Sequence, residues 1–228
     1  MKTSLLAVLA GVLAAQAGGC AGVAWIAAQL APPRKVHAQF RPPAQKRCLV
    51  LVDDVLSGQG AYETVKDMLT ERLNQELAEH KIAASTIPYG QVAHLAAITP
   101  RYNDLSIPQI GRKLDADLVL YVQIDRFELR DSPVETLWHG CFVASVKMVD
   151  AQQGRLWPMD RPDGHQVGPV EIPIHDSSQP AHDVALTQEL VDRMADRVAK
   201  LFYDHRQSAQ ELQEQQQEEP FQQDPPPP

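Results

Sequence analysis

The sequence has little of what binding to nucleic acids or nucleotides requires. Its 21 Lys and Arg residues are outnumbered by 29 Asp and Glu residues, so the formal net charge is -8. A nucleic-acid-binding protein normally presents a basic face, and this acidic balance argues against one. The chain also contains no Gly-rich phosphate-binding loop. We therefore expect no nucleic-acid partner and no cofactor.

The sequence also lacks a recognisable set of catalytic residues. Asp53 and Asp54 follow a predicted strand, at a position where α/β sheets often place ligands. Adjacent residues point apart, however, so this pair does not form a converging acid and base, and a solvated loop is the favoured interpretation. Cys141 has His139 on the same face of a predicted strand. That strand belongs to a packed sheet, which favours a core pair over a nucleophile with its base.

One segment contains enough histidine to suggest a metal site. Histidine and carboxylate side chains are zinc ligands, but the spacings in this segment match no known ligand pattern. We therefore expect no metal site and no enzyme activity. The alternative is a metal-dependent or hydrolytic enzyme that uses residues 159–183, where the candidate ligands are His165, His175, Asp176, His182 and Asp183.

The N-terminal residues have the features of an export signal. A positive charge is followed by apolar residues 5–15, and the small residues 17–19 precede Cys20. This pattern resembles a bacterial lipobox, in which the cysteine becomes the acylated first residue after cleavage. Ala17 departs from the lipobox, because Leu is commoner three positions before the cysteine. The alternative is an uncleaved single-pass anchor, since residues 4–31 are long and apolar enough to span a bilayer.

Lipid attachment at Cys20 predicts a membrane-anchored lipoprotein of the bacterial cell envelope that faces the periplasm. Ala21 is not the acidic residue that retains some lipoproteins in the inner membrane, which favours the outer membrane. A Gln-, Glu- and Pro-rich tail buries too little apolar surface to fold, so we expect it to be disordered. The predicted segments are a signal peptide (1–19), a lipidated N-terminus with an apolar segment and a Pro-rich linker (20–45), an α/β domain (46–206) and the tail (207–228).

Cys48 and Cys141 are the cysteines of the predicted domain. An exported protein permits a disulfide bond between them. Both lie in predicted core strands, however, and two buried free thiols are the favoured interpretation. The separation of their Cα atoms decides between these alternatives.

Two continuous apolar runs predict the centre of a sheet. Residues 48–52 and 118–122 are unbroken apolar segments, typical of strands that are buried on both faces beneath helices. After the second run the apolar residues change from even to odd positions, which predicts a β-bulge near Asp125 and Arg126. Residues 138–150 alternate apolar and polar side chains, which is typical of an antiparallel strand with one wetter face.

Residues 159–180 are rich in proline and predict an irregular loop, with a short edge strand at 170–174.

Helical periodicity predicts that helices cover this sheet. The elements together predict an α/β fold (an α+β sandwich), with a mixed sheet of about five strands packed with helices and a long C-terminal helix. The helices are expected at 62–80, 89–98, 107–114 and 183–206.

Two motifs in this order resemble a known superfamily. Gly111 begins a Gly-x-x-Leu-x-Ala-Asp-x-Val-Leu strand entry, and an Asp-x-x-x-Gly-x-x-Trp hairpin runs from Asp150 to Trp157. With the lipobox, they resemble the periplasmic lipoproteins that include CsgG, the curli secretion channel subunit, and the activators of penicillin-binding proteins. The resemblance implies an α/β sandwich similar to the N-terminal domain of TolB over about residues 46–206. Its motifs are structural and imply no chemistry.

One feature of the curli channel is missing from this sequence. That channel builds its pore from long inserted amphipathic hairpins, and no pair of alternating stretches of ~10 residues occurs here outside the predicted core sheet. We therefore expect no pore. The expected function is a non-enzymatic binding or assembly module for an envelope protein partner, held at the membrane by its N-terminal lipid.

Overall fold

The computed structural model describes residues 34–43, 45–54, 63–129, 137–176 and 182–207, without the side chains of 137–139, 173–176 and 182–183. These residues form two compact units, each described by itself. The larger unit comprises residues 37–204. The smaller unit is a two-stranded antiparallel sheet of β1 (Arg34–Val36) and β8 (His205–Gln207). Cys20, the predicted signal peptide and residues 208–228 of the predicted disordered tail lie outside the described residues. Gln207, the first residue of that predicted tail, is ordered, because it belongs to β8 and pairs with Arg34.

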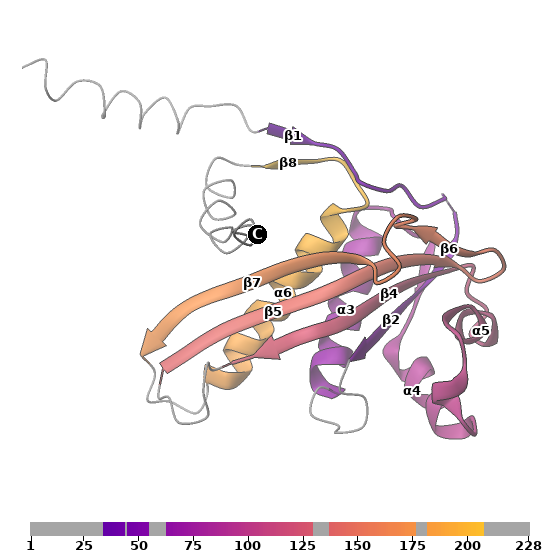
Figure 1. Cartoon of the computed structure of the whole chain (residues 1–228), viewed down its shortest axis with the longest axis horizontal. Helices are drawn as coiled ribbons and strands as arrows, with labels where there is room; N and C mark the ends of the chain where they lie inside the picture. The colour runs from indigo at the N-terminus through magenta and orange to yellow at the C-terminus, as the bar shows by residue number, and fades with distance from the viewer. Residues whose placement is uncertain (1–33, 44, 55–62, 130–136, 177–181, 208–228) are drawn as a thin grey trace, which may run out of the picture. The chain divides into compact units, whose positions relative to one another are not determined.

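The larger unit is built on a six-stranded mixed sheet (Figure 1). The strand order is β3-β2-β4-β5-β6, and β7 also pairs with β5. β2 is parallel to β3 and β4, whereas β5 pairs antiparallel with β4, β6 and β7. The predicted placement of both apolar runs in the middle of one sheet is therefore confirmed. The strands are β2 (Arg47–Asp54), β3 (Ser85–Ile87), β4 (Leu118–Glu128), β5 (Leu137–Asp150), β6 (Gly154–Trp157) and β7 (His165–Asp176).

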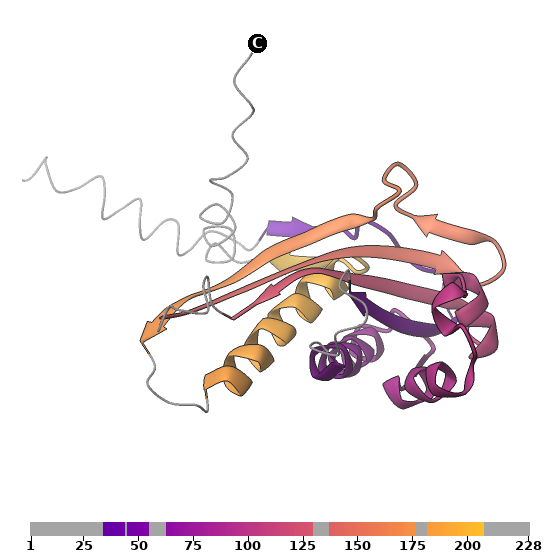
Figure 2. The ribbon, with the colours of Figure 1, turned by 60° about the horizontal axis from the view of Figure 1, so that its bottom comes forward.

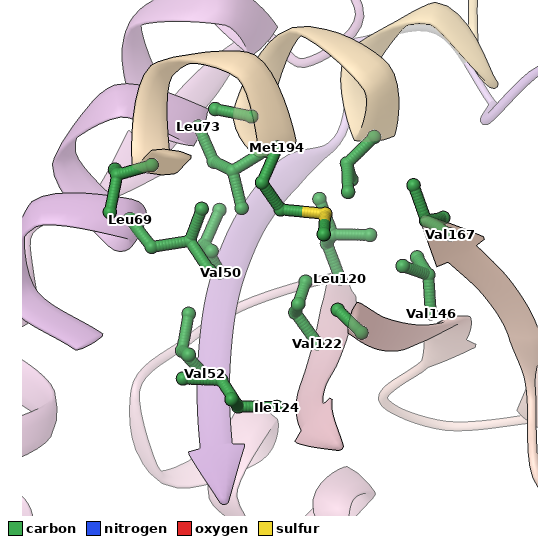
Figure 3. Packing of buried hydrophobic residues seen from close by; sticks show 14 of the residues in the cluster. Val50, Val52, Leu69, Leu73, Leu120, Val122, Ile124, Val146, Val167 and Met194 are labelled. Atoms are coloured by element: carbon green, nitrogen blue, oxygen red, sulfur yellow. The ribbon is translucent and has the colours of Figure 1, made fainter. Parts of the chain in front are cut away.

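Helices cover both faces of β2 and β4. Successive side chains of a strand point to opposite faces, so even-numbered and odd-numbered residues meet different helices. α3 (Glu63–Glu79) and α6 (His182–Lys200) lie together on the even-numbered face (Figure 2). Figure 3 shows Leu73 and Met194 from these helices above Val50 and Leu120. The odd-numbered face is covered by α4 (Tyr89–Ile98), the short η1 (Tyr102–Asp104) and α5 (Ile107–Lys113).

The predicted bulge in β4 is confirmed, and two local features account for the start of α5 and for the turn before β6. The pairing of β4 with β5 shifts register between Ile124 and Arg126, where the change of apolar phase predicts a bulge. Ser106 is the N-cap of α5, in a capping box with Gln109. Gly154 has a φ of 92°, which a tight hairpin favours. The α/β class, the mixed sheet and the C-terminal helix are likewise those predicted from the sequence.

Two predicted elements begin or end at different residues in the structure. The segment predicted as an irregular loop contains β7, a strand of 12 residues. β7 pairs only with β5 among the described residues, and such an edge strand accommodates proline because its outer N–H groups need no partner. The C-terminal helix ends at Lys200 instead of Arg206. There the chain tightens into a turn that buries Leu201 and Phe202.

Residues 37–41 belong to the larger unit, although they lie in the segment predicted as a linker. The Ala38 amide donates to Asp204, and the Gln39 and Phe40 amides both donate to the Leu201 carbonyl. The Phe40 ring also packs against the hydrophobic core. These contacts hold the segment against the end of α6.

Candidate functional site

The connections of the sheet create a place for a ligand at the carboxyl ends of β2 and β3. β2 leads into α3 on the even-numbered face, whereas β3 leads into α4 on the opposite face. Adjacent parallel strands whose connections leave on opposite faces open a crevice beyond their carboxyl ends. The first residues of both helices and the last residues of β2 therefore surround one position.

A cleft of about 980 Å³ occupies this position. Its size is within the range of pockets that hold small ligands. Its floor is the odd-numbered face of the sheet, from Leu51 and Asp53 across Tyr121 to Lys147. Its apolar walls come from α4, the segment after η1 and α5, through Val92, Ala93, Ala96, Leu105, Ile107 and Ile110. The cleft is thus apolar between the helices and polar where the sheet is uncovered.

Asp53 lies on the floor of the cleft. Its Oδ2 atom accepts a hydrogen bond from the Tyr121 hydroxyl at 3.3 Å, and its Oδ1 atom accepts one from the Asp54 amide at 2.9 Å. Burial raises the pKa of Tyr121, and the negative charge of Asp53 raises it further. Tyr121 therefore stays protonated at neutral pH and acts as a hydrogen-bond donor.

Asp54 points to the other face, toward α3. Its Oδ2 atom lies 2.6 Å from Lys66 Nζ, and the same ammonium group lies 3.2 Å from Glu63. Glu63 also accepts a 2.6 Å hydrogen bond from the Tyr89 hydroxyl, which together with Lys66 outweighs burial and lowers the pKa of Glu63. This chain of contacts joins β2 to α3 and α3 to α4.

The prediction for the two aspartates is half confirmed. Their side chains point apart, as expected for adjacent strand residues. The prediction of a solvated loop is wrong, because both residues belong to β2 and Asp54 is only 9% exposed. The ion pair with Lys66 offsets the cost of burying this carboxylate, and the sequence offers no signal for that pair.

The Tyr102 hydroxyl is a buried polar group beside the cleft. It has no hydrogen-bond partner among the described residues. Burial raises the pKa of Tyr102, and the negative charge of Asp53 adds to this increase. A buried hydroxyl is normally hydrogen-bonded, so this donor is available to a bound molecule.

Two cations line the end of the cleft formed by β5 and β6. Lys147 Nζ lies 5.7 Å from the centre of the Tyr121 ring, within cation–π distance. The Arg155 guanidinium donates to the carbonyl groups of Arg161 and Pro162. Neither Lys147 nor Arg155 forms an ion pair with a carboxylate of the described residues.

Of the candidate ligands for the alternative, a metal-dependent enzyme, only His165 has a described side chain. His165 lies in β7, with its ring 5.1 Å from that of Trp157, and burial lowers its pKa. No group of three or more His, Cys, Asp or Glu residues in the described part of the chain is placed to hold a metal ion. The other candidates, His175, Asp176, His182 and Asp183, have side chains outside the described residues.

The predicted core thiols are confirmed. Cys48 and Cys141 are buried and free, so no disulfide joins them. The His139 side chain, the expected partner of Cys141, lies outside the described side chains.

Among the described helices, none combines the length and the apolar character that crossing a membrane requires.

The sequence interpretation missed Lys66, Tyr89, Tyr102 and Tyr121 as cleft residues. A signal was present in β4 and β5, where Tyr121 interrupts the odd-numbered apolar positions and Lys147 lies on the wetter face. The other three residues enter the cleft through the crossing of α3, α4 and η1, which hydrophobic periodicity does not specify.

The comparisons with known proteins found solved structures that resemble this chain only weakly. No model of a known protein family matches the chain, and no curated protein matches it. Lipoprotein GNA1162 from Neisseria meningitidis is 15% identical, with a TM-score of 0.38, over 68% of this chain and 99% of that one. Protein XCC0632 from Xanthomonas campestris, described as DUF330, is 12% identical, with a TM-score of 0.42, over 81% and 97%.

A third solved structure is the PelC dodecamer from Paraburkholderia phytofirmans. It is 12% identical to this chain, with a TM-score of 0.33, over 71% of this chain and 95% of that one. At such TM-scores these likenesses do not identify the family or the function of the chain. The resemblance to the CsgG superfamily therefore stays a prediction.

Proposed function

We propose that this chain is a lipid-anchored protein of the bacterial envelope whose folded domain binds a partner without converting it chemically. The cleft between the odd-numbered face of the sheet and α4 and α5 is the binding site. One observation carries the choice of site: two crossover connections leave β2 and β3 on opposite faces, and the cleft opens where they part.

The contacts that the charged groups of the cleft make within the chain favour binding over catalysis. The carboxylate of Asp53 accepts hydrogen bonds from Tyr121 and from the Asp54 amide. Asp54 and Glu63 share the ammonium group of Lys66. A general acid or base must reach the ligand and exchange a proton with it, whereas these carboxylates are already engaged by partners within the chain. These side chains therefore shape and orient a site for a ligand.

The residues before the folded domain support the proposed lipid anchor. Residues 17–19 are small, they follow an apolar segment, and they precede Cys20 as in a lipobox. Acylation of Cys20 attaches the chain to the periplasmic side of a membrane. Ala21 favours the outer membrane, because it is not the acidic residue that retains some lipoproteins in the inner membrane.

Metabolic labelling with an alkyne analogue of palmitate tests the anchor. The full chain, expressed in a bacterium, should incorporate the label and fractionate with the outer membrane. Cys20→Ala should abolish labelling and leave the precursor uncleaved, whereas Ala21→Asp should keep the label and move the protein toward the inner membrane. Unchanged labelling and processing of Cys20→Ala would refute lipid attachment at this residue.

Site-specific photo-crosslinking tests the binding site in cells. A photoreactive amino acid replaces Ala93, which lines the cleft and is exposed, or Glu71, which is exposed on α3. The proposal expects a discrete crosslinked product from position 93 and none from position 71. Equal products from both positions, or no product from position 93, would contradict a binding role for the cleft.

A further inference from the structure

The cleft contains two cations that no described carboxylate neutralises. The carboxylates of Asp53, Asp54 and Glu63 are each engaged by hydrogen bonds or by Lys66. Lys147 and Arg155 line the same cleft and form no ion pair with a described carboxylate. A bound group of negative charge therefore meets two cations whose charge no described carboxylate neutralises, whereas a bound cation would compete with Lys66 for its partners.

The rest of the cleft is apolar. Leu51 and Val149 form part of its floor, and Val92, Ala96 and Ile110 form part of its walls. Side chains of this kind stabilise a hydrocarbon body by removing its surface from water, at about 25 cal/mol per Å². The Tyr102 hydroxyl, without a partner among the described residues, adds one hydrogen-bond donor beside this apolar region.

We propose that the cleft binds an amphipathic ligand with an apolar body and one anionic head group, a carboxylate or a phosphate monoester. The head group lies at Lys147 and Arg155, and the apolar body lies between the sheet and α4. The Tyr102 hydroxyl donates a hydrogen bond to an oxygen atom of the ligand. This inference rests on the proposed binding function and adds the chemical class of the ligand.

Amphiphiles that share one tail and differ in the head group separate these contributions. The full chain is reconstituted in lipid nanodiscs, and binding is measured by equilibrium dialysis with empty nanodiscs as the blank. The probes are octanoate, octyl phosphate, octyltrimethylammonium and octyl glucoside, each below its micellar concentration. Saturable binding of octanoate or octyl phosphate above the blank is expected, and the stronger of the two identifies the head group.

Variants connect this binding to named residues. Lys147→Met keeps the apolar stem and removes the charge, and it should weaken anion binding about tenfold because a charge-assisted hydrogen bond is lost. Arg155→Gln should have an effect in the same direction, which keeps the test valid if one variant fails to fold. Lys113→Met, at an exposed position outside the cleft, should leave binding unchanged. Ala93→Trp should reduce the binding of both anions by filling the cleft.

Three results would overturn the anionic ligand: equal binding of octyltrimethylammonium, no saturable binding of either anion, or unchanged affinity in both charge variants. None of them bears on photo-crosslinking from position 93. A crosslinked partner together with no anion binding would retain the binding module and remove the proposed ligand class. Loss of both results would remove the binding module as well.

Discussion

The ammonium group of Lys66 lies 2.6 Å from the carboxylate of Asp54, and their side chains are only 13% and 8% exposed. The pair joins the end of β2 to the first turn of α3. Burial lowers the pKa of Lys66, but the hydrogen bonds to Asp54 and Glu63 outweigh burial, so the net pKa is raised. A raised pKa means that the pair contributes its full stability below the ordinary pKa of 10.5 and loses it only above the raised value.

Lys66→Met should destabilise the fold by about 3 kcal/mol, because it leaves the Asp54 carboxylate buried without its counter-ion. Replacing both charges, as in Lys66→Met with Asp54→Leu, should cost less than the single change, since no charge stays buried. The free energy of unfolding from urea titration measures both effects. A single variant within about 0.5 kcal/mol of the unmodified protein would show that the pair is not structural.

Asp204 holds residues 37–41 and should release them in acid. The Ala38 amide, then Arg41, lower the pKa of Asp204 to about 2. A lowered pKa means that the contact is fully formed above the ordinary pKa of 3.8 and is lost as the pH falls through about 2. Hydrogen exchange of the Ala38 amide should therefore accelerate, beyond its intrinsic pH dependence, between about pH 4 and pH 2.

Asp204→Asn should weaken this contact already at pH 7, because the charge-assisted bond to Arg41 is lost. Asp160→Asn is the matched control, since Asp160 is exposed, far from Ala38 in the sequence, and forms an ion pair with its neighbour Arg161 at 3.7 Å. Protection of the Ala38 amide that is equal in the unmodified protein and in Asp204→Asn would contradict the role assigned to Asp204.

The central strands were predictable because burial on both faces leaves a signal in a short window. Residues 48–52 and 118–122 are apolar at every position, and few other environments permit that. The bulge beside Arg126 was predictable for a similar reason, since a change of apolar phase requires an extra residue in one strand. β7 was mostly missed, because its prolines are typical of loops and are accommodated only at a sheet edge.

The cleft was less predictable than the sheet. The sequence predicts that Asp53 and Asp54 lie at a strand end, but their environments depend on which helix covers which face. Lys66 belongs to the amphipathic helix predicted at 62–80, where a charged residue is expected to be solvated. Its burial against Asp54 arises from the crossing of α3 over β2, a tertiary relationship without a local pattern.

Gly111 should be required by close packing between α5 and the sheet. A Cβ atom on Gly111 would lie 2.8 Å from Val119 Cγ2 and 3.3 Å from Ala151 Cβ. Gly111→Ala should therefore destabilise the fold by about 1–3 kcal/mol, as overpacking does, and adding Val119→Ala should recover part of the loss. Gly90 in α4 is the matched control, because a Cβ atom there meets nothing within 4 Å.

Gly90→Ala should be neutral or stabilising by up to about 1 kcal/mol, since alanine has the higher helix propensity. Thermal and urea unfolding compare the two glycine variants directly. If Gly111→Ala were as stable as Gly90→Ala, the Gly-x-x-Leu-x-Ala-Asp motif would not reflect the approach of helix and strand.

The buried thiols should be unreactive in the folded protein. Burial raises the pKa of Cys48 to about 12, and burial also raises the pKa of Cys141. At pH 8 the reactive thiolate of Cys48 is therefore on the order of one molecule in ten thousand. The disulfide reagent DTNB should label neither thiol in native protein and both in urea, and Ser85→Cys, at an exposed position, should react at once. A third reactive thiol in urea would show that Cys20 is unmodified, and rapid native labelling of Cys48 or Cys141 would contradict their burial.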